Sequence, residues 1–286
     1  MLTLGNAACG FGAVTFAAKV GPDTGGGEEL VIASLLIFLA MLFDALDGSA
    51  ARLTDQTSDF GAQLDSLCDA ISFGLAPAFL MLQFLSPTHH LNLMDELLQG
   101  ANVRLFEYPR KLLWVIAVLY VLCALLRLAR FNVETDDEDS HDFFSGLPSP
   151  AAAGTIASFP LAVRGLAIFA NEPTSALYHI ARRSIGGIAL LLPIITLAVA
   201  MLMVSRLRYP HVFNQFFKGS RTRSQVLQLV FCTAMLFLMK ETLPLIFCYF
   251  AFGPPLRAGF HEYFGGLFSA RTVSSDAREG QHEADE

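Results

Sequence analysis

Four aspartates between residues 44 and 69 are the side chains in this sequence best suited to chemistry. Asp44 and Asp47 are three residues apart, and Asp65 and Asp69 are four residues apart. Each spacing places two acids on one face of a helix, and the polar stretch 53–60 predicts a turn that brings the two faces together. Carboxylates in this number suit Mg²⁺ or Mn²⁺, which also take phosphate oxygens. We therefore expect two divalent ions and a phosphate-bearing substrate here.

The neighbours of the aspartates extend this interpretation. Gly48 lets a ligand approach the helix backbone closely, and Arg52 follows one turn later, where its guanidinium can bind a phosphate. The alternative is that the acids cap helix ends or pair with basic residues. Arg52 is the only basic residue between positions 44 and 69, so pairing cannot neutralise four acids. Ionisable groups at membrane depth are costly and usually functional.

The elements that must position these residues are membrane helices. The chain has 286 residues, of which 53% are hydrophobic and 16% charged. Apolar segments fall at 2–20, 30–48, 62–85, 112–131, 148–170, 185–205 and 226–252. Several approach the 20 or so residues that a helix needs to cross a bilayer, and in lipid such segments must be helical. The sequence predicts an all-α membrane protein with six core helices and one or two extra C-terminal transmembrane helices.

The domain organisation follows from these segments. We expect a catalytic membrane domain at 2–205, a basic cytoplasmic loop at 206–225, additional transmembrane segments within 226–255 and a disordered polar tail at 270–286. The loop contains the densest basic stretch of the chain: Arg206, Arg208, Lys218, Arg221 and Arg223. Basic loops favour the cytoplasmic side, and six crossings place the aspartates on that side too. The active site is therefore predicted to face the cytoplasm.

Other compositional signals exclude several classes of protein. Basic residues form no stripe interleaved with aromatic residues, so no nucleic-acid partner is expected. The five cysteines lie in apolar segments without a C-x-x-C pair, which is typical of small buried side chains. The chemistry therefore centres on the aspartates.

The pattern D-x-x-D-G-x-x-A-R-x8-G-x3-D-x3-D, complete from Asp44 to Asp69, resembles the signature of the CDP-alcohol phosphatidyltransferase family. The resemblance implies a membrane enzyme with six core helices that uses two divalent ions and displaces CMP from a CDP-lipid with an alcohol. It also implies that the four aspartates are metal ligands and that Asp69 accepts the proton of the attacking hydroxyl. The CDP-lipid contacts implied by position are Gly48, Arg52, Ser58 and Gly61.

The start of the chain departs from the family pattern. Relatives carry a Pro-Asn pair just before this point, and its asparagine helps to hold the nucleotide. Either the natural chain starts earlier than the printed Met1, or Thr3 and Asn6 make the CDP-lipid contacts instead.

Further motifs, one of them overlapping the signature, resemble the bacterial and archaeal phosphatidylserine synthase branch of the family. They are Leu2–Asn6, Gln63–Leu67, Ser72–Pro77, Arg127–Asn132 and Phe144–Pro150. The resemblance covers about residues 2–255 and implies CDP-diacylglycerol and L-serine as substrates, in a multi-pass protein of the cell (inner) membrane. Family members are commonly homodimers, although no residue of this chain argues for one.

Two arginines give a physical reason to expect an amino-acid acceptor. Arg127 and Arg130 are three residues apart at the predicted cytoplasmic end of a helix, where a guanidinium could hold the serine carboxylate. Asn132 and the turn with Gly146 and Pro148 could line the same pocket. The alternative is that both arginines extend to lipid phosphates.

Three rival functions fit parts of the pattern. Another member of the family could use glycerol phosphate, inositol phosphate or choline as its acceptor. A Mg²⁺-dependent membrane prenyltransferase would spread two acidic motifs over well-separated helices, unlike the close pairs here. An ion carrier would not need Arg52 beside its carboxylates, because that cation would compete with the cargo.

Overall fold

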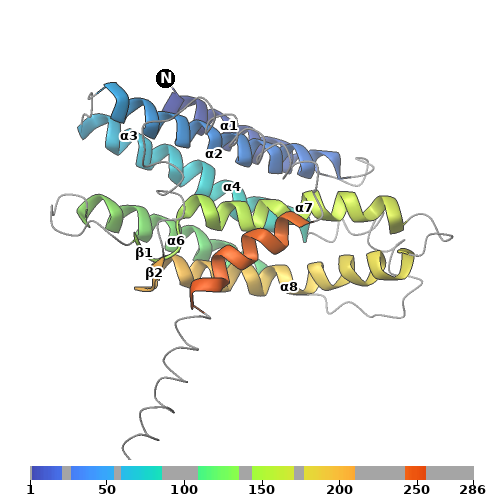
Figure 1. Cartoon of the computed structure of the whole chain (residues 1–286). Helices are drawn as coiled ribbons and strands as arrows, with labels where there is room; N and C mark the ends of the chain where they lie inside the picture. Colours follow the sequence, from blue (N-terminus) through green and yellow to red (C-terminus); the bar gives the residue numbers. More distant parts are fainter. Residues whose placement is uncertain are drawn as a thin grey trace, which may run out of the picture. The chain divides into compact units, whose positions relative to one another are not determined.

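The structure is a computed structural model that describes residues 2–20, 27–54, 59–85, 109–134, 144–170, 177–209 and 242–255 (Figure 1). Its helices are α1 (Leu2–Ala18), α2 (Glu28–Thr54), α3 (Asp59–Asp69), η1 (Ala70–Leu75), α4 (Ala76–Phe84), α6 (Arg110–Glu134), α7 (Ser149–Ala170) and α8 (Tyr178–Val204), followed by the helix Leu243–Pro255. Two two-residue strands, β1 (Phe144–Ser145) and β2 (Arg208–Tyr209), pair antiparallel. The prediction of an all-α protein is confirmed.

Five of the described helical segments are long and apolar enough to cross a membrane: Glu28–Asp47, Phe60–Phe84, Arg110–Val133, Ser149–Ala170 and Tyr178–Val204. Helix α1 and the helix Leu243–Pro255 are shorter apolar helices. The helices of the six core segments all form where the apolar runs predict them. Residues 226–241 lie outside the described part of the chain, so the choice between one and two C-terminal helices stays open. The predicted basic loop beyond Tyr209 and the predicted disordered tail also lie outside the described residues and stay predictions.

Small side chains let the first two helices pack closely. Ala13 and Ala17 of α1 and Ala33 and Ala40 of α2 are almost fully buried, and α1 lies along α2 (Figure 1). Close backbone approach through small residues is typical of helix pairs in membranes. This packing brings the start of α1 beside the end of α2, where Asp44 and Asp47 lie.

The third membrane segment is continuous from α3 through α4 but changes its helical geometry in the middle. Residues Ala70–Leu75 form a π-helical turn, η1, immediately after Asp69. Pro77 lies in the first turn of α4. It has no N–H to donate to the Phe73 carbonyl four residues earlier, and loss of such a bond is a common cause of a local change in helix geometry.

A short ordered stretch, residues 144–148, precedes α7. Gly146 has φ +84°, and a Cβ there would lie 2.9 Å from the Ser205 carbonyl oxygen, so only glycine fits without strain. Its N–H donates to the Leu207 carbonyl, and the Leu147 N–H donates to the Leu202 carbonyl. These bonds hold the end of α8 against the start of α7, and the buried α7 forms much of the core.

Candidate active site

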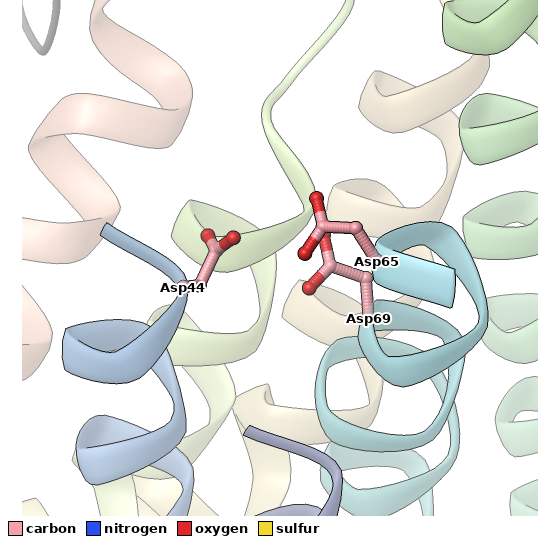
Figure 2. Close-up of side chains that lie close together, drawn as sticks. All are labelled: Asp44, Asp65 and Asp69. Carbon is pink, nitrogen blue, oxygen red and sulfur yellow. The ribbon is translucent and has the colours of Figure 1, made fainter. Parts of the chain in front are cut away.

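Three aspartates meet at one end of the helices. Asp44 comes from α2, and Asp65 and Asp69 come from successive turns of α3. One carboxylate oxygen of each lies within 4.8 Å of the others, and Figure 2 shows Asp44 pointing toward the α3 pair. Helix α2 ends at Thr54 and α3 begins at Asp59. Asp44 of α2 therefore meets the acidic face of α3, while residues 55–58 of the predicted turn lie outside the described residues.

Asp47 lies outside this group of three. Its Oδ2 accepts a hydrogen bond from the Thr3 hydroxyl of α1. Thr3 was expected to contact the CDP-lipid, which stays a prediction, and its hydroxyl bonds a predicted metal ligand. The structure thus joins the start of α1 to the aspartate region, while a ligand role for Asp47 stays a prediction.

Asn6 connects α1 to the aspartate cluster. Its side-chain N–H donates to Oδ1 of Asp69 at 2.8 Å, and both residues are buried. The Ser72 hydroxyl, one turn after Asp69, donates to the Asn6 backbone carbonyl at 2.9 Å. Asn6 was expected to contact the CDP-lipid, and in this structure its side chain fixes one oxygen of Asp69.

Tyr120 of α6 supports the same segment from the opposite side. Its hydroxyl donates to the Phe73 carbonyl at 3.0 Å, the carbonyl that Pro77 cannot satisfy. Tyr120 and Phe73 are fully buried, and a buried carbonyl without a partner is costly. Tyr120 therefore stabilises the π-helical turn that follows Asp69.

Arg127 brings a positive charge to the cluster from α6. Its guanidinium interacts electrostatically with Asp69 and Asp44, and one terminal N–H donates to the Ser149 hydroxyl at 2.5 Å. Its Nε is buried without a hydrogen-bond partner. The side chain of Arg127 therefore lies beside the aspartates, while its role as a ligand of the acceptor stays a prediction.

The remaining residues of the predicted acceptor pocket lie on α6 and in the stretch before α7. Asn132 accepts a hydrogen bond of 3.0 Å from the Ser66 hydroxyl of α3. Gly146 and Pro148 form the turn before α7, and Arg130 is half-buried on α6. Ser66 and Asn132 therefore join α3 to the end of α6 beside Asp65.

The other predicted CDP-lipid residues are only partly described. Gly48 and Arg52 belong to α2 by their backbone, and Gly61 belongs to α3. The side chain of Arg52 and the whole of Ser58 lie outside the described residues. Their contacts with a substrate stay predictions.

The donor set fits a divalent cation. Asp44 and Asp69 interact with the guanidinium of Arg127, and Asp65 adds a third carboxylate, so three ionised acids would leave two negative charges without a counter-charge among these four side chains. Oδ1 of Asp65 is buried without a hydrogen-bond partner. Uncompensated buried charge is strongly unfavourable, and oxygen ligands suit Mg²⁺ or Mn²⁺. The residues present therefore match the predicted metal chemistry, although they do not select one ion.

The sequence assigned no role to four polar side chains that build this site. Ser66, Ser72 and Ser149 lie in the branch motifs quoted above, whereas Tyr120 lies outside them. Pro77 within an apolar helix signals that the Phe73 carbonyl needs another donor. No pattern in the sequence identifies Tyr120 as that donor, because the two residues are 47 positions apart.

Together, the fold and the site define a multi-pass helical membrane protein with a carboxylate cluster suited to a divalent ion. The family model described as CDP-alcohol phosphatidyltransferase matches residues 1–193. The chain therefore belongs to the CDP-alcohol phosphatidyltransferase family, as the aspartate signature predicted.

Individual relatives support the same assignment. The archaetidylserine synthase of Methanothermobacter thermautotrophicus is 35% identical over 186 residues, covering 64% of this chain and 60% of the relative. The CDP-diacylglycerol–serine O-phosphatidyltransferase of Mycobacterium tuberculosis is 36% identical over 125 residues, covering 42% and 36%. The protein of that name from Methanocaldococcus jannaschii is 30% identical over 182 residues, covering 64% and 65%. Each match spans less than two thirds of the relative's length.

Proposed function

We propose that this chain makes phosphatidylserine and CMP from CDP-diacylglycerol and L-serine. The observation that carries the proposal is the meeting of Asp44, Asp65 and Asp69 beside the half-buried Arg127. The acids could hold a metal ion, which suits a diphosphate donor. The adjacent guanidinium could hold a carboxylate, which suits an amino-acid acceptor. The three relatives described above are named archaetidylserine synthase or CDP-diacylglycerol–serine O-phosphatidyltransferase, and these names support the choice of serine.

The aspartates would bind the metal and the donor. Asp44, Asp65 and Asp69 supply one group of ligands, and Asp47 would contribute to a second ion. Bound Mg²⁺ or Mn²⁺ would offset the charge of the diphosphate and stabilise the departing oxygen. Arg52, one turn after Gly48 on α2, would bind the same diphosphate.

Asp69 would act as the general base. It would accept the proton of the serine hydroxyl while the serine oxygen forms a bond to the lipid-linked phosphorus. The bond from that phosphorus to the CMP oxygen breaks, and CMP leaves with the electron pair. Asn6 holds one oxygen of Asp69 and would leave the other directed at the substrate.

Arg127 would hold the acceptor. Ser149 binds one terminal nitrogen of its guanidinium, and its Nε is buried without a partner. A guanidinium fixed in this way suits a planar carboxylate. Asn132, bonded to Ser66 beside Asp65, would border the same pocket.

We also propose that the aspartate end of the helices faces the cytoplasm. The turn beside Ser149 pairs with the chain that follows α8, so the basic stretch starting at Arg206 leaves from this same end. Basic residues favour the cytoplasmic side of a membrane. Labelling of single cysteines placed at Arg206 and at Arg183 in intact cells would test this orientation.

The substrate assignment is tested by an acceptor panel. Purified protein receives CDP-diacylglycerol, Mg²⁺ or Mn²⁺, and in separate reactions L-serine, glycerol phosphate, inositol phosphate or choline, and CMP release is followed. The proposal predicts that, of these four acceptors, only serine supports CMP release. Release with glycerol phosphate but not with serine would overturn the serine assignment and leave the metal site intact.

A further inference from the structure

A groove of about 620 Å³ lies between the end of α4 and the start of α6. Its apolar wall is formed by Leu82, Leu85, Leu113 and Val115, and its polar lining by Gln83, Arg110 and Lys111, with Trp114 at the edge. Trp114 is the only tryptophan of the chain and is 61% exposed. The groove therefore combines a strip of apolar surface with two adjacent cations.

The groove lies far from the aspartate cluster. Arg110 begins α6 and Arg127 lies near its end, which corresponds to about 25 Å along a helix rising roughly 1.5 Å per residue. The hydrocarbon core of a bilayer is about 30 Å thick. The groove and the cluster therefore belong to opposite membrane surfaces, and the groove cannot be part of the proposed active site.

The order of residues along α6 matches the layers of a membrane surface. Arg110 and Lys111 come first and are exposed, Trp114 follows one turn later, and exposed leucines follow from Leu119 onward. Tryptophan favours the level of lipid headgroups, with cations outside it and aliphatic side chains inside. Among the described residues, no carboxylate pairs with Arg110 or Lys111.

We propose that this groove binds one anionic phospholipid of the leaflet opposite the active site. Arg110 and Lys111 would hold the lipid phosphate, Trp114 and Gln83 would contact the glycerol region, and an acyl chain would lie along Leu82, Leu85 and Leu113. Charge complementarity selects a lipid with net negative charge over a zwitterionic lipid of the same chains, since each basic residue adds to the attraction.

A second pair of basic residues provides a matched control. Arg182 and Arg183 lie at the start of α8, at the same end of the helices as Arg110. Arg182 donates a hydrogen bond to the Tyr178 hydroxyl and lies over that ring. Neither residue lines the groove. Removing this pair changes the net charge by the same amount but leaves the groove intact.

Native mass spectrometry of the full-length protein tests the proposal. The detergent-purified protein is titrated with dioleoyl phosphatidylglycerol or dioleoyl phosphatidylcholine. The wild type should retain one phosphatidylglycerol in preference to phosphatidylcholine. The double variant R110Q/K111Q should bind phosphatidylglycerol on the order of 10- to 30-fold more weakly, whereas R182Q/R183Q should bind like the wild type. Inorganic phosphate, which has no acyl chain, should not compete.

Further variants and readouts separate the alternatives. Val115→Trp keeps both cations and fills the groove, so it should also weaken retention of phosphatidylglycerol. This variant tests the groove independently if R110Q/K111Q folds poorly. Equal losses in R110Q/K111Q and R182Q/R183Q would show a general effect of surface charge and overturn the proposal. Conversion of a dimer to a monomer by R110Q/K111Q without lipid loss would identify a second copy as the occupant and also overturn it.

Discussion

The side-chain amide of Asn6 donates a hydrogen bond of 2.8 Å to Oδ1 of Asp69, although the residues are 63 positions apart. Asn6 is fully buried, and Asp69 is 9% exposed. The bond fixes the carboxylate that we propose as the general base. It also makes α1 part of the active site, a role that the aspartate signature does not contain.

Substitution of Asn6 should therefore impair catalysis. Asn6→Ala removes the donor to Asp69, and loss of such a supporting residue typically costs about 10- to 100-fold in activity or metal affinity. CMP release measured over a range of Mn²⁺ concentrations will show whether kcat or the metal requirement changes. Thr15→Ala is the control, because the Thr15 hydroxyl donates to the nearby Gly12 carbonyl within α1 and, among the described residues, bonds no aspartate. Equal activity of the two variants would contradict the role of Asn6.

The hydrogen bond from Tyr120 to the Phe73 carbonyl predicts that substitutions of Tyr120 and Pro77 have non-additive effects on stability. Tyr120→Phe leaves a buried carbonyl without a donor, which costs about 1–3 kcal/mol and lowers the unfolding temperature by about 2–10 °C. Pro77→Ala restores an N–H four residues after Phe73. Thermal unfolding of the single and double variants then forms a double-mutant cycle. The double variant should lose less stability than the sum of the two single variants, and strict additivity would refute the explanation.

Close packing of α1 on η1 predicts a severe effect at Gly10. A Cβ at this position would lie 2.7 Å from the Ser72 Cα, which is backbone and cannot rotate away. Gly10→Ala should destabilise the protein by about 1–3 kcal/mol through overpacking and displace Asn6 from Asp69. Gly187→Ala is the matched helix control, since nothing lies within 4 Å of its added Cβ. Unfolding temperature and CMP release should both fall in the first variant only.

Arg127 should determine how well the enzyme binds serine. Arg127→Lys keeps the charge but loses the planar pair of donors, so kcat/KM for serine should fall about 10- to 100-fold, the equivalent of one or two charged hydrogen bonds. The KM for CDP-diacylglycerol should change little. Arg183→Lys, at the opposite end of the helices, controls for lysine substitution. An increase confined to the KM for CDP-diacylglycerol would instead place Arg127 on the diphosphate.

The sequence predicted those parts of the structure that depend on local patterns. Apolar runs located the core helices. The spacing of the four aspartates predicted that their helix faces meet, and the structure brings together three of the four, Asp44, Asp65 and Asp69. Contacts between distant segments were not predictable, because no local pattern encodes them. The Asn6 bond to Asp69 and the engagement of Asp47 by Thr3 depend on how α1 packs. Short pairings such as β1 with β2 also arise from tertiary position rather than from propensity.

The π-helical turn after Asp69 is an intermediate case. Pro77 indicates a missing helical hydrogen bond, yet a proline in an apolar helix is compatible with a kink, a π-turn or a helix boundary. The buried Tyr120 hydroxyl supplies the donor that completes this structure. The local sequence thus identifies the unmet carbonyl, and only the fold identifies its partner.

The most direct test of the account is transfer of labelled serine into lipid by Asp69→Asn and the wild type. The folding of both proteins is first verified by circular dichroism. Both are then assayed with CDP-diacylglycerol and Mn²⁺, and the amount of labelled serine in lipid is compared with the amount of CMP released. The account predicts equimolar labelled phosphatidylserine and CMP from the wild type, none without divalent metal, and almost none from the variant. Turnover by Asp69→Asn at a rate near that of the wild type would contradict it.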